Sequence, residues 1–559
     1  MSSPFDSLPA AQAGLHLDDA RDLLAGIDAL LEPALEKART ITEDGRKIDD
    51  HQVLTERVTY AATEARAARE LVEYVAGAQS EGRADRALEL TAVASVAELA
   101  GNVRRHMEEC LDDLGLDESA LEASFPAERR ARLRQAGSEA LLRAIGEHQI
   151  AIKGSNDWPL DETLEQVRES VREFGEQEIY PHAERIHRHD EIIPEAFIEK
   201  MGELGYFGLS VPEEYGGHEM GNLAMILTTE ELSRASLAAA GSLITRPEIL
   251  SKALLQGGSE AQKKAWLPKL ASGEVMAGVS VTEPDIGSDV ASLKCRAERA
   301  TVDGEDGWVI NGPKSWCTFA GRADVLALLA RTDPDASKGQ KGLSLFIVPK
   351  DRFDGHDFEM KQPGGGRIVG KADATPGYRG MHSFTLNLEN YFVPAANLVG
   401  EDEGLDRGFY LQMGGFAAGR LQTGGRGSGL AQAALEKTVE YVVDRNQFGQ
   451  SIADFQLTRF TIGQMAARIA AGRAITYAAA TAFDEDERKA APLAAQAKLL
   501  ACDIAVAVTQ QGQLMHGGWG YAEEYPISRY VVDAQVLPIF EGVKPILELR
   551  VIGRSLLSG

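Results

Sequence analysis

An acidic residue near the C-terminus has the surroundings of a catalytic base. Glu541 lies between the apolar residues 536–540 and Gly542. A carboxylate in such surroundings is poorly solvated, which favours proton uptake near neutral pH. The side chain could therefore remove a proton from a carbon next to a carbonyl. A turn in which the glutamate caps a helix explains the same residues equally well.

Two segments in the middle of the chain could contact a flat, anionic cofactor. Residues 281–289 form a loop of small and polar residues, whose backbone N–H groups could approach an anion closely. Trp316 and Thr318 follow an Asn-Gly turn and offer an aromatic surface beside a hydroxyl donor. The alternative interpretations are a plain turn and a tryptophan packed on a sheet face.

The elements that must position these residues follow from hydrophobic periodicity. Apolar residues recur at three-to-four spacing in 61–78 and 89–111, which predicts amphipathic helices. Short β-rich runs separated by turns begin after residue 275 and predict a small β-barrel or sandwich. Long helical patterns return from residue 402 onward. The pattern divides the chain into a helical extension (1–153), a helical domain (154–274), a β domain (275–400) and a helical bundle (401–559).

Composition limits the classes of partner and compartment. The 559 residues carry a net charge of −27, which argues against nucleic acid or an anionic membrane as the main partner. No run of 18 apolar residues and no secretory signal is evident, so a cytoplasmic protein is expected. The four cysteines are scattered without metal-binding spacing, and we expect free thiols and no metal site of this kind.

From about residue 160 onward the chain resembles the acyl-CoA dehydrogenase family. This resemblance implies a mainly α fold with a central β domain, placed between a helical domain and a four-helix bundle. It also implies FAD-dependent α,β-dehydrogenation of an acyl-CoA thioester. The segments that carry the resemblance are 204–217, 281–289, 314–318, 378–381, 393–400, 444–449, 516–521 and 540–542.

The resemblance assigns Glu541 as the base that removes the α-proton. Some family members carry the base just before the arginine that matches Arg420, but Gly419 occupies that position here. Substrate contacts are expected from Arg420, Ser288 and Gly542. The residues expected to bind FAD are Val281, Thr282, Gly287, Ser288, Trp316, Thr318, Arg445, Phe448, Gln456, Gly517 and Gly518.

The resemblance also implies partners. FAD sites shared between subunits imply a homo-oligomer, either a dimer or a tetramer. The expected electron acceptor is an electron-transferring flavoprotein. Residues Val543, Lys544 and Pro545 depart from the family pattern, which leaves the adenine-end contacts of that turn open. The glycine-rich stretch 424–429 has no preceding apolar strand and is not a nicotinamide-binding loop.

The extension 1–153 and the Gly-rich stretch 363–377 are similar to the branch of the family that converts (2S)-methylsuccinyl-CoA to mesaconyl-CoA in the ethylmalonyl-CoA pathway. Such a substrate ends in a carboxylate, which Arg246 could bind as a bidentate pair. A surface arginine at a helix start is the alternative. The other functions to weigh are another short-chain, branched-chain or glutaryl-type dehydrogenase, an acyl-CoA oxidase, and a DNA-associated homologue.

Overall fold

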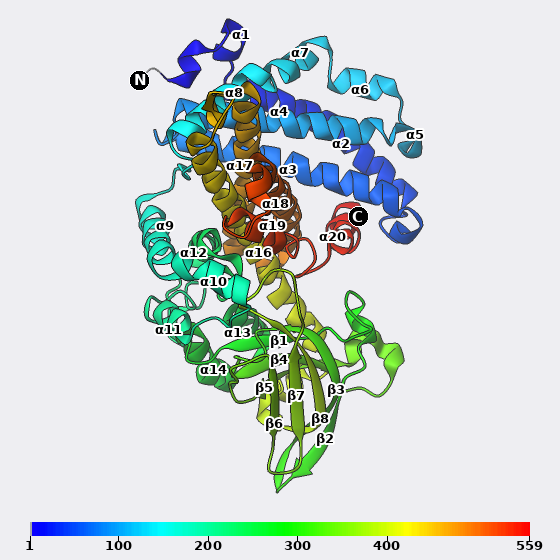
Figure 1. Cartoon of the computed structure of the whole chain (residues 1–559). Helices are drawn as coiled ribbons and strands as arrows, with labels where there is room; N and C mark the ends of the chain where they lie inside the picture. The colour runs from blue at the N-terminus through cyan, green and yellow to red at the C-terminus, as the bar shows by residue number, and fades with distance from the viewer. Residues whose placement is uncertain (1–2, 559) are drawn as a thin grey trace. The chain divides into compact units, whose positions relative to one another are not determined.

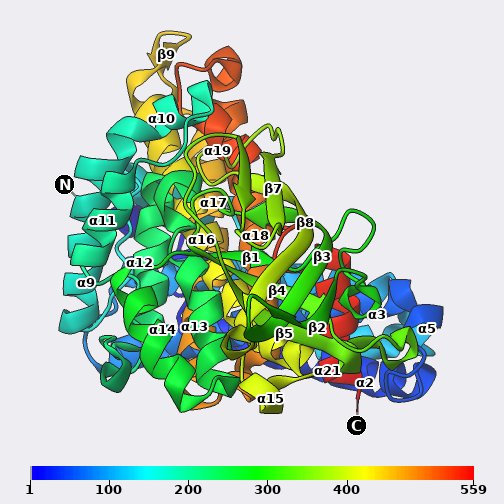
Figure 2. The same ribbon diagram turned by 90° about the horizontal axis from the view of Figure 1, so that it is seen from below.

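The computed structural model describes residues 3–558 and contains two compact units. One unit, called unit 1 below, consists of residues 1–169, 423–483 and 489–559. The other, unit 2, consists of residues 170–422 and 484–488. Figure 1 shows the whole chain and Figure 2 a second view of it.

The first part of unit 1 consists of helices whose apolar faces pack on one another. The long helices are α2 (Leu17–Ile41), α3 (Gln52–Ser80), α4 (Arg86–Glu108) and α8 (Glu139–Ala151). Asp85 fixes the start of α4, because its side chain accepts a hydrogen bond from the Leu88 N–H at 2.8 Å. The two predicted helices 61–78 and 89–111 lie within α3 and largely within α4, which confirms the helical pattern.

The C-terminal part of unit 1 contains long helices. These are α16 (Gly408–Asp444, from residue 423 onward), α17 (Gln456–Glu485), α18 (Glu487–Met515) and α19 (Ile527–Ala534). Among the described residues, only α18 is long and apolar enough to cross a membrane, but 72% of its most apolar stretch is buried. That burial is typical of a core helix.

Glycines allow these helices to cross at close range. A Cβ on Gly146 of α8 would lie 1.8 Å from the Arg459 carbonyl oxygen of α17. A Cβ on Gly463 would lie 1.9 Å from the Leu142 carbonyl oxygen. The glycine-rich stretch 424–429 is helical, as predicted, and a Cβ on Gly427 would meet the Ala501 carbonyl oxygen at 2.8 Å. Close helix packing therefore explains this stretch.

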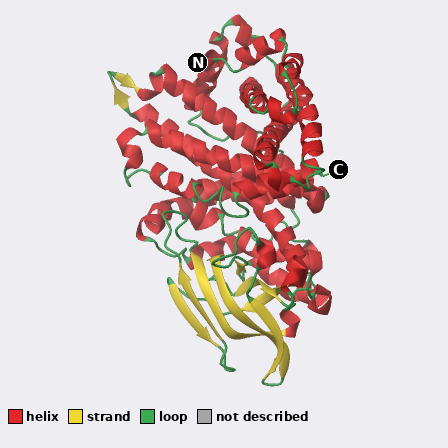
Figure 3. Ribbon diagram, turned by 90° about the vertical axis from the view of Figure 1, so that its right-hand side faces the viewer, coloured by secondary structure: helices red, strands yellow, loops and turns green. Residues whose placement is uncertain are grey.

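Unit 2 contains one curled sheet and a set of helices. The strand order is β1-β4-β2-β3-β8-β7-β6, with β5 paired to β4. Strands β1 and β2 pair with β4 in parallel, and the remaining pairs are antiparallel. Figure 3 shows these strands as one layer. Their bounds are Ala277–Ser280, Arg296–Val302, Glu305–Thr318, Val325–Arg331, Leu343–Pro349, Asp357–Lys361, Arg367–Ala372 and Ser383–Pro394.

The β pattern in the sequence is confirmed, because the predicted β-rich runs 308–310, 325–329, 343–348 and 383–388 lie within β3, β4, β5 and β8. The Gly-rich stretch 363–377 forms the β6–β7 turn, strand β7 and the loop after it. Residues 367–372 of this stretch are therefore part of the sheet. A separate hairpin, β9 (Asn446–Gln447) and β10 (Gln450–Ser451), belongs to unit 1.

The remaining helices are shorter. They are α1 (Ala10–Ala13), α5 (Leu111–Leu114), α6 (Glu118–Ser124), α7 (Ala127–Ala136), α9 (Glu162–Phe174), α10 (Tyr180–His189), α11 (Glu195–Glu203), α12 (Gly221–Ala235), α13 (Thr245–Gly257), α14 (Glu260–Ser272), α15 (Glu401–Gly404), α20 (Lys544–Ile546) and α21 (Arg554–Leu557).

Candidate functional site

The loop that carries Glu541 lies between α19 and α20 in unit 1. Glu541 is half-buried and has a φ of +54°, which is unusual for a residue with a side chain, and Gly542 follows with a φ of +101°. Arg426 lies over the Phe540 ring, 4.7 Å from its centroid. The Lys498 ammonium donates to the Gly542 carbonyl at 2.8 Å. The helices of the bundle thus hold this loop on both sides of Glu541.

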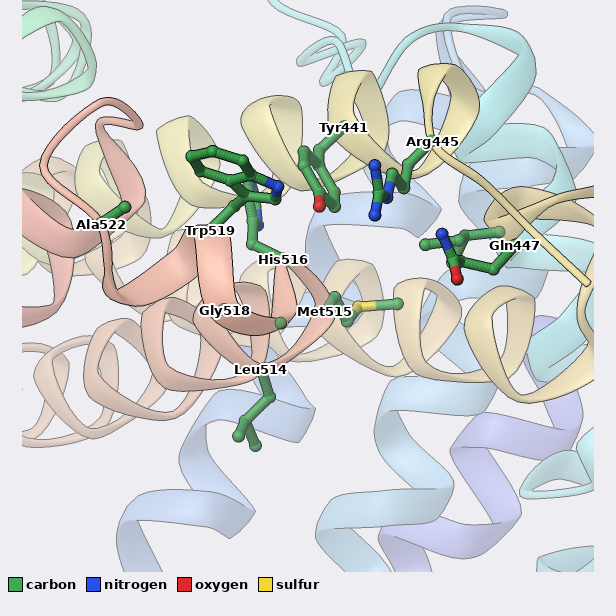
Figure 4. Close-up of a pocket in the computed structure, with 11 residues that line it drawn as sticks. Tyr441, Arg445, Gln447, Leu514, Met515, His516, Gly518, Trp519 and Ala522 are labelled. Atoms are coloured by element: carbon green, nitrogen blue, oxygen red, sulfur yellow. The ribbon is translucent and has the colours of Figure 1, made fainter.

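A cavity of about 530 Å³ lies in the C-terminal part of unit 1 (Figure 4). Arg445, Gly517 and Gly518, all expected to contact FAD, line it together. A Cβ on either glycine would have no neighbour within 4 Å, so the backbone is open to a ligand. The other lining residues are Tyr441, Gln447, Ile452, Leu514, Met515, His516, Trp519 and Ala522.

Two aromatic residues of this cavity were missed by sequence reasoning. The rings of Tyr441 and His516 stack with centroids 4.2 Å apart. The His516 Nδ1 lies 2.7 Å from the Gly512 carbonyl oxygen, and burial lowers the pKa of the imidazole. His516 directly precedes the two glycines, so its position beside them was the available signal.

Phe448 and Gln456 do not line the cavity. Phe448 is 95% exposed, and Gln456 is exposed at the start of α17.

In unit 2, the loop 281–289 is fixed by a buried charge pair. The Lys314 ammonium donates to the Val281 carbonyl at 2.9 Å and to Glu283 at 3.1 Å. The Ser315 N–H donates to the Thr282 carbonyl at 2.8 Å. These bonds join the loop to the end of β3, so the two predicted cofactor segments lie side by side. Gly287 again has open space where a Cβ would stand.

The end of β3 presents a large aromatic surface to the outside of the sheet. Trp316 is 59% exposed and has a φ of +55°. The Thr318 hydroxyl lies 2.9 Å from the Ser383 hydroxyl. The alternative in which Trp316 packs on a sheet face is therefore wrong. An exposed tryptophan is available to stack against a flat ligand.

The arginine considered for substrate binding is buried. Arg246 lies in the first turn of α13, is only 3% exposed, and its Nε donates to the Ser242 carbonyl at 3.3 Å. The Thr245 hydroxyl donates to Gln422 Oε1 at 2.6 Å, and the buried Gln422 Nε2 has no hydrogen-bond partner among the described residues. Arg420 is half-buried on α16. The alternative of a surface arginine at position 246 is wrong.

These residues fit FAD by their chemistry. An exposed tryptophan and a loop with free space at Gly287 in unit 2 suit a flat ring. An arginine and two glycines with free space in unit 1 suit a pyrophosphate, because backbone N–H groups and a cation can both reach its oxygens.

Family models match nearly the whole chain. "Acyl-CoA dehydrogenase, N-terminal domain" matches residues 161–274, and "Acyl-CoA dehydrogenase, middle domain" matches residues 278–391. "Acyl-CoA dehydrogenase, C-terminal domain" matches two stretches, 20–147 and 406–557. The match of residues 20–147 to this model was not expected from the sequence, because the helical pattern of the extension does not by itself show that it is related to the family.

Individual relatives agree with these matches. The chain is 36% identical to (2S)-methylsuccinyl-CoA dehydrogenase of Cereibacter sphaeroides, over 96% of this chain and 98% of that protein. It is 36% identical to glutaryl-CoA dehydrogenase of Desulfococcus multivorans, over 69% of this chain and 94% of that protein.

A solved structure of glutaryl-CoA dehydrogenase with glutaryl-CoA matches with a TM-score of 0.64 and 34% identity, over 71% of this chain and 95% of that one. Butyryl-CoA dehydrogenase of Megasphaera elsdenii matches with a TM-score of 0.64 and 30% identity, over 72% of this chain and all of that one. The fold, the cofactor-like cavity and these matches together place the chain in the acyl-CoA dehydrogenase family, as an FAD-dependent enzyme.

Proposed function

We propose that the enzyme oxidises (2S)-methylsuccinyl-CoA to mesaconyl-CoA, as a step of the ethylmalonyl-CoA pathway. The observation that carries the choice of substrate is the burial of Arg246, because a cation in a buried position suits an acyl group that ends in a carboxylate. Gln422 adds a second buried donor on the helix that Thr245 contacts. The match to the methylsuccinyl-CoA enzyme also extends through the N-terminal region, whereas the glutaryl-CoA enzyme covers 69% of the chain.

Glu541 is the proposed base. The substrate loses its α-proton to the Glu541 carboxylate and a hydride from its β-carbon, and the Cα–Cβ double bond forms. FAD, when bound, accepts that hydride. The backbone N–H of Glu541 polarises the thioester carbonyl, which makes the α-proton more acidic. The left-handed conformation of Glu541 and the bond from Lys498 to Gly542 fix the direction of both groups.

Val281, Thr282, Gly287, Ser288, Trp316 and Thr318 are the proposed ring-side contacts of FAD. For the other end, the proposed contacts are Arg445, Phe448, Gln456, Gly517 and Gly518, which act on the FAD of a neighbouring copy. Phe448, Leu457, Leu514 and Tyr521 are apolar or aromatic side chains exposed on unit 1, which supports a homo-oligomer.

The proposal is tested by anaerobic titration of the FAD-loaded enzyme with acyl-CoA esters. Methylsuccinyl-CoA should bleach the flavin absorbance faster than glutaryl-CoA and 2-methylbutyryl-CoA. The first comparison separates two dicarboxylic substrates and the second removes only the distal charge. A preference for glutaryl-CoA would support the glutaryl-type alternative, and a preference for 2-methylbutyryl-CoA would overturn the role of the carboxylate.

Two variants assign the residues. Glu541→Gln should keep FAD and thioester affinity but lose flavin reduction by several orders of magnitude, because the amide cannot accept the proton. Arg246→Met should slow methylsuccinyl-CoA oxidation by about two to three orders of magnitude, since breaking a buried charge pair costs about 3–5 kcal/mol. The rate with 2-methylbutyryl-CoA should not fall. Equal losses on both substrates would make Arg246 a structural residue.

The proposed electron acceptor is an electron-transferring flavoprotein. One structural neighbour, with a TM-score of 0.65 and 31% identity, comes from work on the "Electron transferring flavoprotein of Acidaminococcus fermentans". Reduced enzyme should pass electrons to such a protein, or to a dye, much faster than to oxygen. Rapid peroxide production in air would instead identify an acyl-CoA oxidase.

A further inference from the structure

Three side chains in unit 2 that have no role in the site described above converge on one point. Asp190 ends helix α10, His356 lies in the loop before β6, and His382 directly precedes β8. The two Nε2 atoms of the histidines are 3.0 Å apart. Asp190 Oδ1 is 3.1 Å from His382 Nε2, and Asp190 Oδ2 is 3.9 Å from His356 Nε2.

We propose that Asp190, His356 and His382 bind a divalent transition-metal ion of the zinc type. Zinc in proteins takes imidazole nitrogen at about 2.0–2.1 Å and carboxylate oxygen at about 2.0–2.2 Å in tetrahedral geometry. Two ligand atoms of such a site stand roughly 3.3 Å apart by that geometry. The separations His356 Nε2–His382 Nε2 (3.0 Å) and Asp190 Oδ1–His382 Nε2 (3.1 Å) lie close to this value. The other Asp190 oxygen, Oδ2, lies 3.9 Å from His356 Nε2.

The hydrogen bonds around the cluster prepare the ligands for a metal. His382 Nδ1 lies 3.2 Å from the Gly380 carbonyl oxygen, which can only accept, so Nδ1 carries the proton of that bond. In the neutral imidazole, Nε2 then has its lone pair directed at an Asp190 carboxylate oxygen. A cation between them resolves this repulsion. A backbone carbonyl on the far nitrogen is the outer partner that metal-binding histidines usually have.

Asp190 also has an outer partner. The Arg379 Nε lies 3.6 Å from Asp190 Oδ1, so the guanidinium can support the carboxylate without occupying the point between the three ligands. The side chains of Asp190 and His356 are 42% and 44% exposed, whereas His382 is buried. An ion can therefore enter from solvent, and water can complete a fourth ligand position.

The cluster connects elements that are distant in sequence. Asp190 comes from the helical part of unit 2, and the two histidines come from the edge of the sheet. The Phe319 N–H donates to the His382 carbonyl at 2.8 Å, next to Thr318 at the end of β3. A bound metal would therefore clamp α10 to the strand ends beside Trp316. This role is independent of the substrate proposed above.

The competing explanation is a proton. An imidazolium on His382 could donate to both Gly380 and Asp190 and satisfy the same groups without metal. The two explanations differ in their response to added metal, because a metal requires both imidazoles in the neutral form and a proton requires only one ring.

The test uses the FAD-loaded enzyme after EDTA treatment and dialysis. Calorimetric titration with ZnCl₂ should show one equivalent bound per chain, and Co²⁺ should give the visible bands of a nitrogen- and oxygen-bound ion. Zinc should also raise the melting temperature. His356→Gln and Asp190→Asn should each weaken zinc binding at least about tenfold, since loss of even an outer partner costs about 10–100-fold.

The matched control is His189→Gln, because His189 is exposed and adjacent to Asp190 but lies outside the cluster. It should bind zinc like the wild type. His356 is half exposed, so its replacement should leave the melting temperature without zinc and the flavin absorbance unchanged. Absence of saturable binding, or equal binding by wild type and His356→Gln, would overturn the metal site and leave the imidazolium explanation.

Discussion

Residues 20–147 and 406–557 match the same family model but differ in chemistry. The C-terminal stretch carries Glu541 and the residues that line the cavity with Arg445. No residue of the N-terminal stretch lines that cavity. The two stretches therefore share a family model, but only the C-terminal one contributes to this cavity.

The N-terminal stretch packs on the segment that follows the proposed base. A Cβ on Gly553 would lie 2.9 Å from Thr55 Cγ2 of α3, so the last helical segment crosses α3 closely. The Arg39 Nε donates to the Leu556 carbonyl at 2.9 Å, and Arg550 pairs with Asp49 at 2.6 Å. The surface of the extension thus packs on the C-terminal helical segment of the same chain.

One polar contact brings the two stretches close to Glu541. The Tyr60 hydroxyl of α3 donates to Asp503 Oδ2 at 2.7 Å, and Lys544 donates to the same oxygen at 2.6 Å. Lys544 also lies over the Tyr60 ring, 4.7 Å from its centroid. Since Lys544 is three residues after Glu541, the extension supports the start of α20 beside the loop of the proposed base. The departure from the family pattern at this position has a structural explanation.

The largest expected effect comes from disrupting the contact between α8 and α17, which joins the two stretches. Gly146→Val should lower the free energy of unfolding by about 3 kcal/mol or more, because its side chain would overlap the α17 backbone. Gly101→Ala on α4 is the control, since its Cβ would meet nothing within 4 Å and alanine favours a helix by about 1 kcal/mol. Urea unfolding measures both. Equal stability of the two variants would mean that the extension does not pack here.

A smaller effect is expected at the contact beside the base. Lys544→Met should lower kcat about tenfold, equivalent to about 1.4 kcal/mol, because the loop loses its fixed position. KM and FAD content should not change, and Lys544→Arg should restore most of the rate. Lys437→Met removes a surface pair with Glu440 on α16 and serves as the control. A changed KM with normal kcat would contradict a positioning role.

The buried carboxyl of Glu64 should make stability depend on pH. Burial raises its pKa from 4.5 to about 8, so the folded state holds a proton that the unfolded state releases between these values. Stability should therefore fall as pH rises from about 5 to about 8. Glu64→Gln should reduce this fall and gain about 1 kcal/mol at the upper end, after relaxation and water entry are allowed for. The exposed Glu36→Gln should leave the pH profile of thermal unfolding unchanged.

The smallest effect tests the extension directly. Tyr60→Phe should lower the rate of flavin reduction about threefold at saturating substrate, since loss of one hydrogen bond costs about 0.5–1.5 kcal/mol. Tyr74→Phe is a matched change on the same helix, because its hydroxyl donates to the Pro159 carbonyl instead. Stopped-flow reduction compares them. Identical rates for the two variants would show that the contact at Tyr60 does not reach the catalytic loop.

The sequence by itself predicted the element types and the candidate functional residues. Three-to-four spacing predicted α3 and α4, and the β-rich runs predicted β3, β4, β5 and β8, because periodicity reflects which face is buried. Glu541, Trp316 and Arg445 were recognised from local segments. Such signals depend on residues close together in the chain, so they can be recognised without the tertiary structure.

Only the tertiary structure decided which residues meet. Arg246 at a helix start could have been exposed or buried, and packing of α13 buried it. His516 joined Tyr441 across two helices, Tyr60 reached Asp503 over 443 residues of chain, and Asp190 met two histidines from strand ends. These contacts depend on helix crossings and strand register, which are set by long-range packing that no local segment contains.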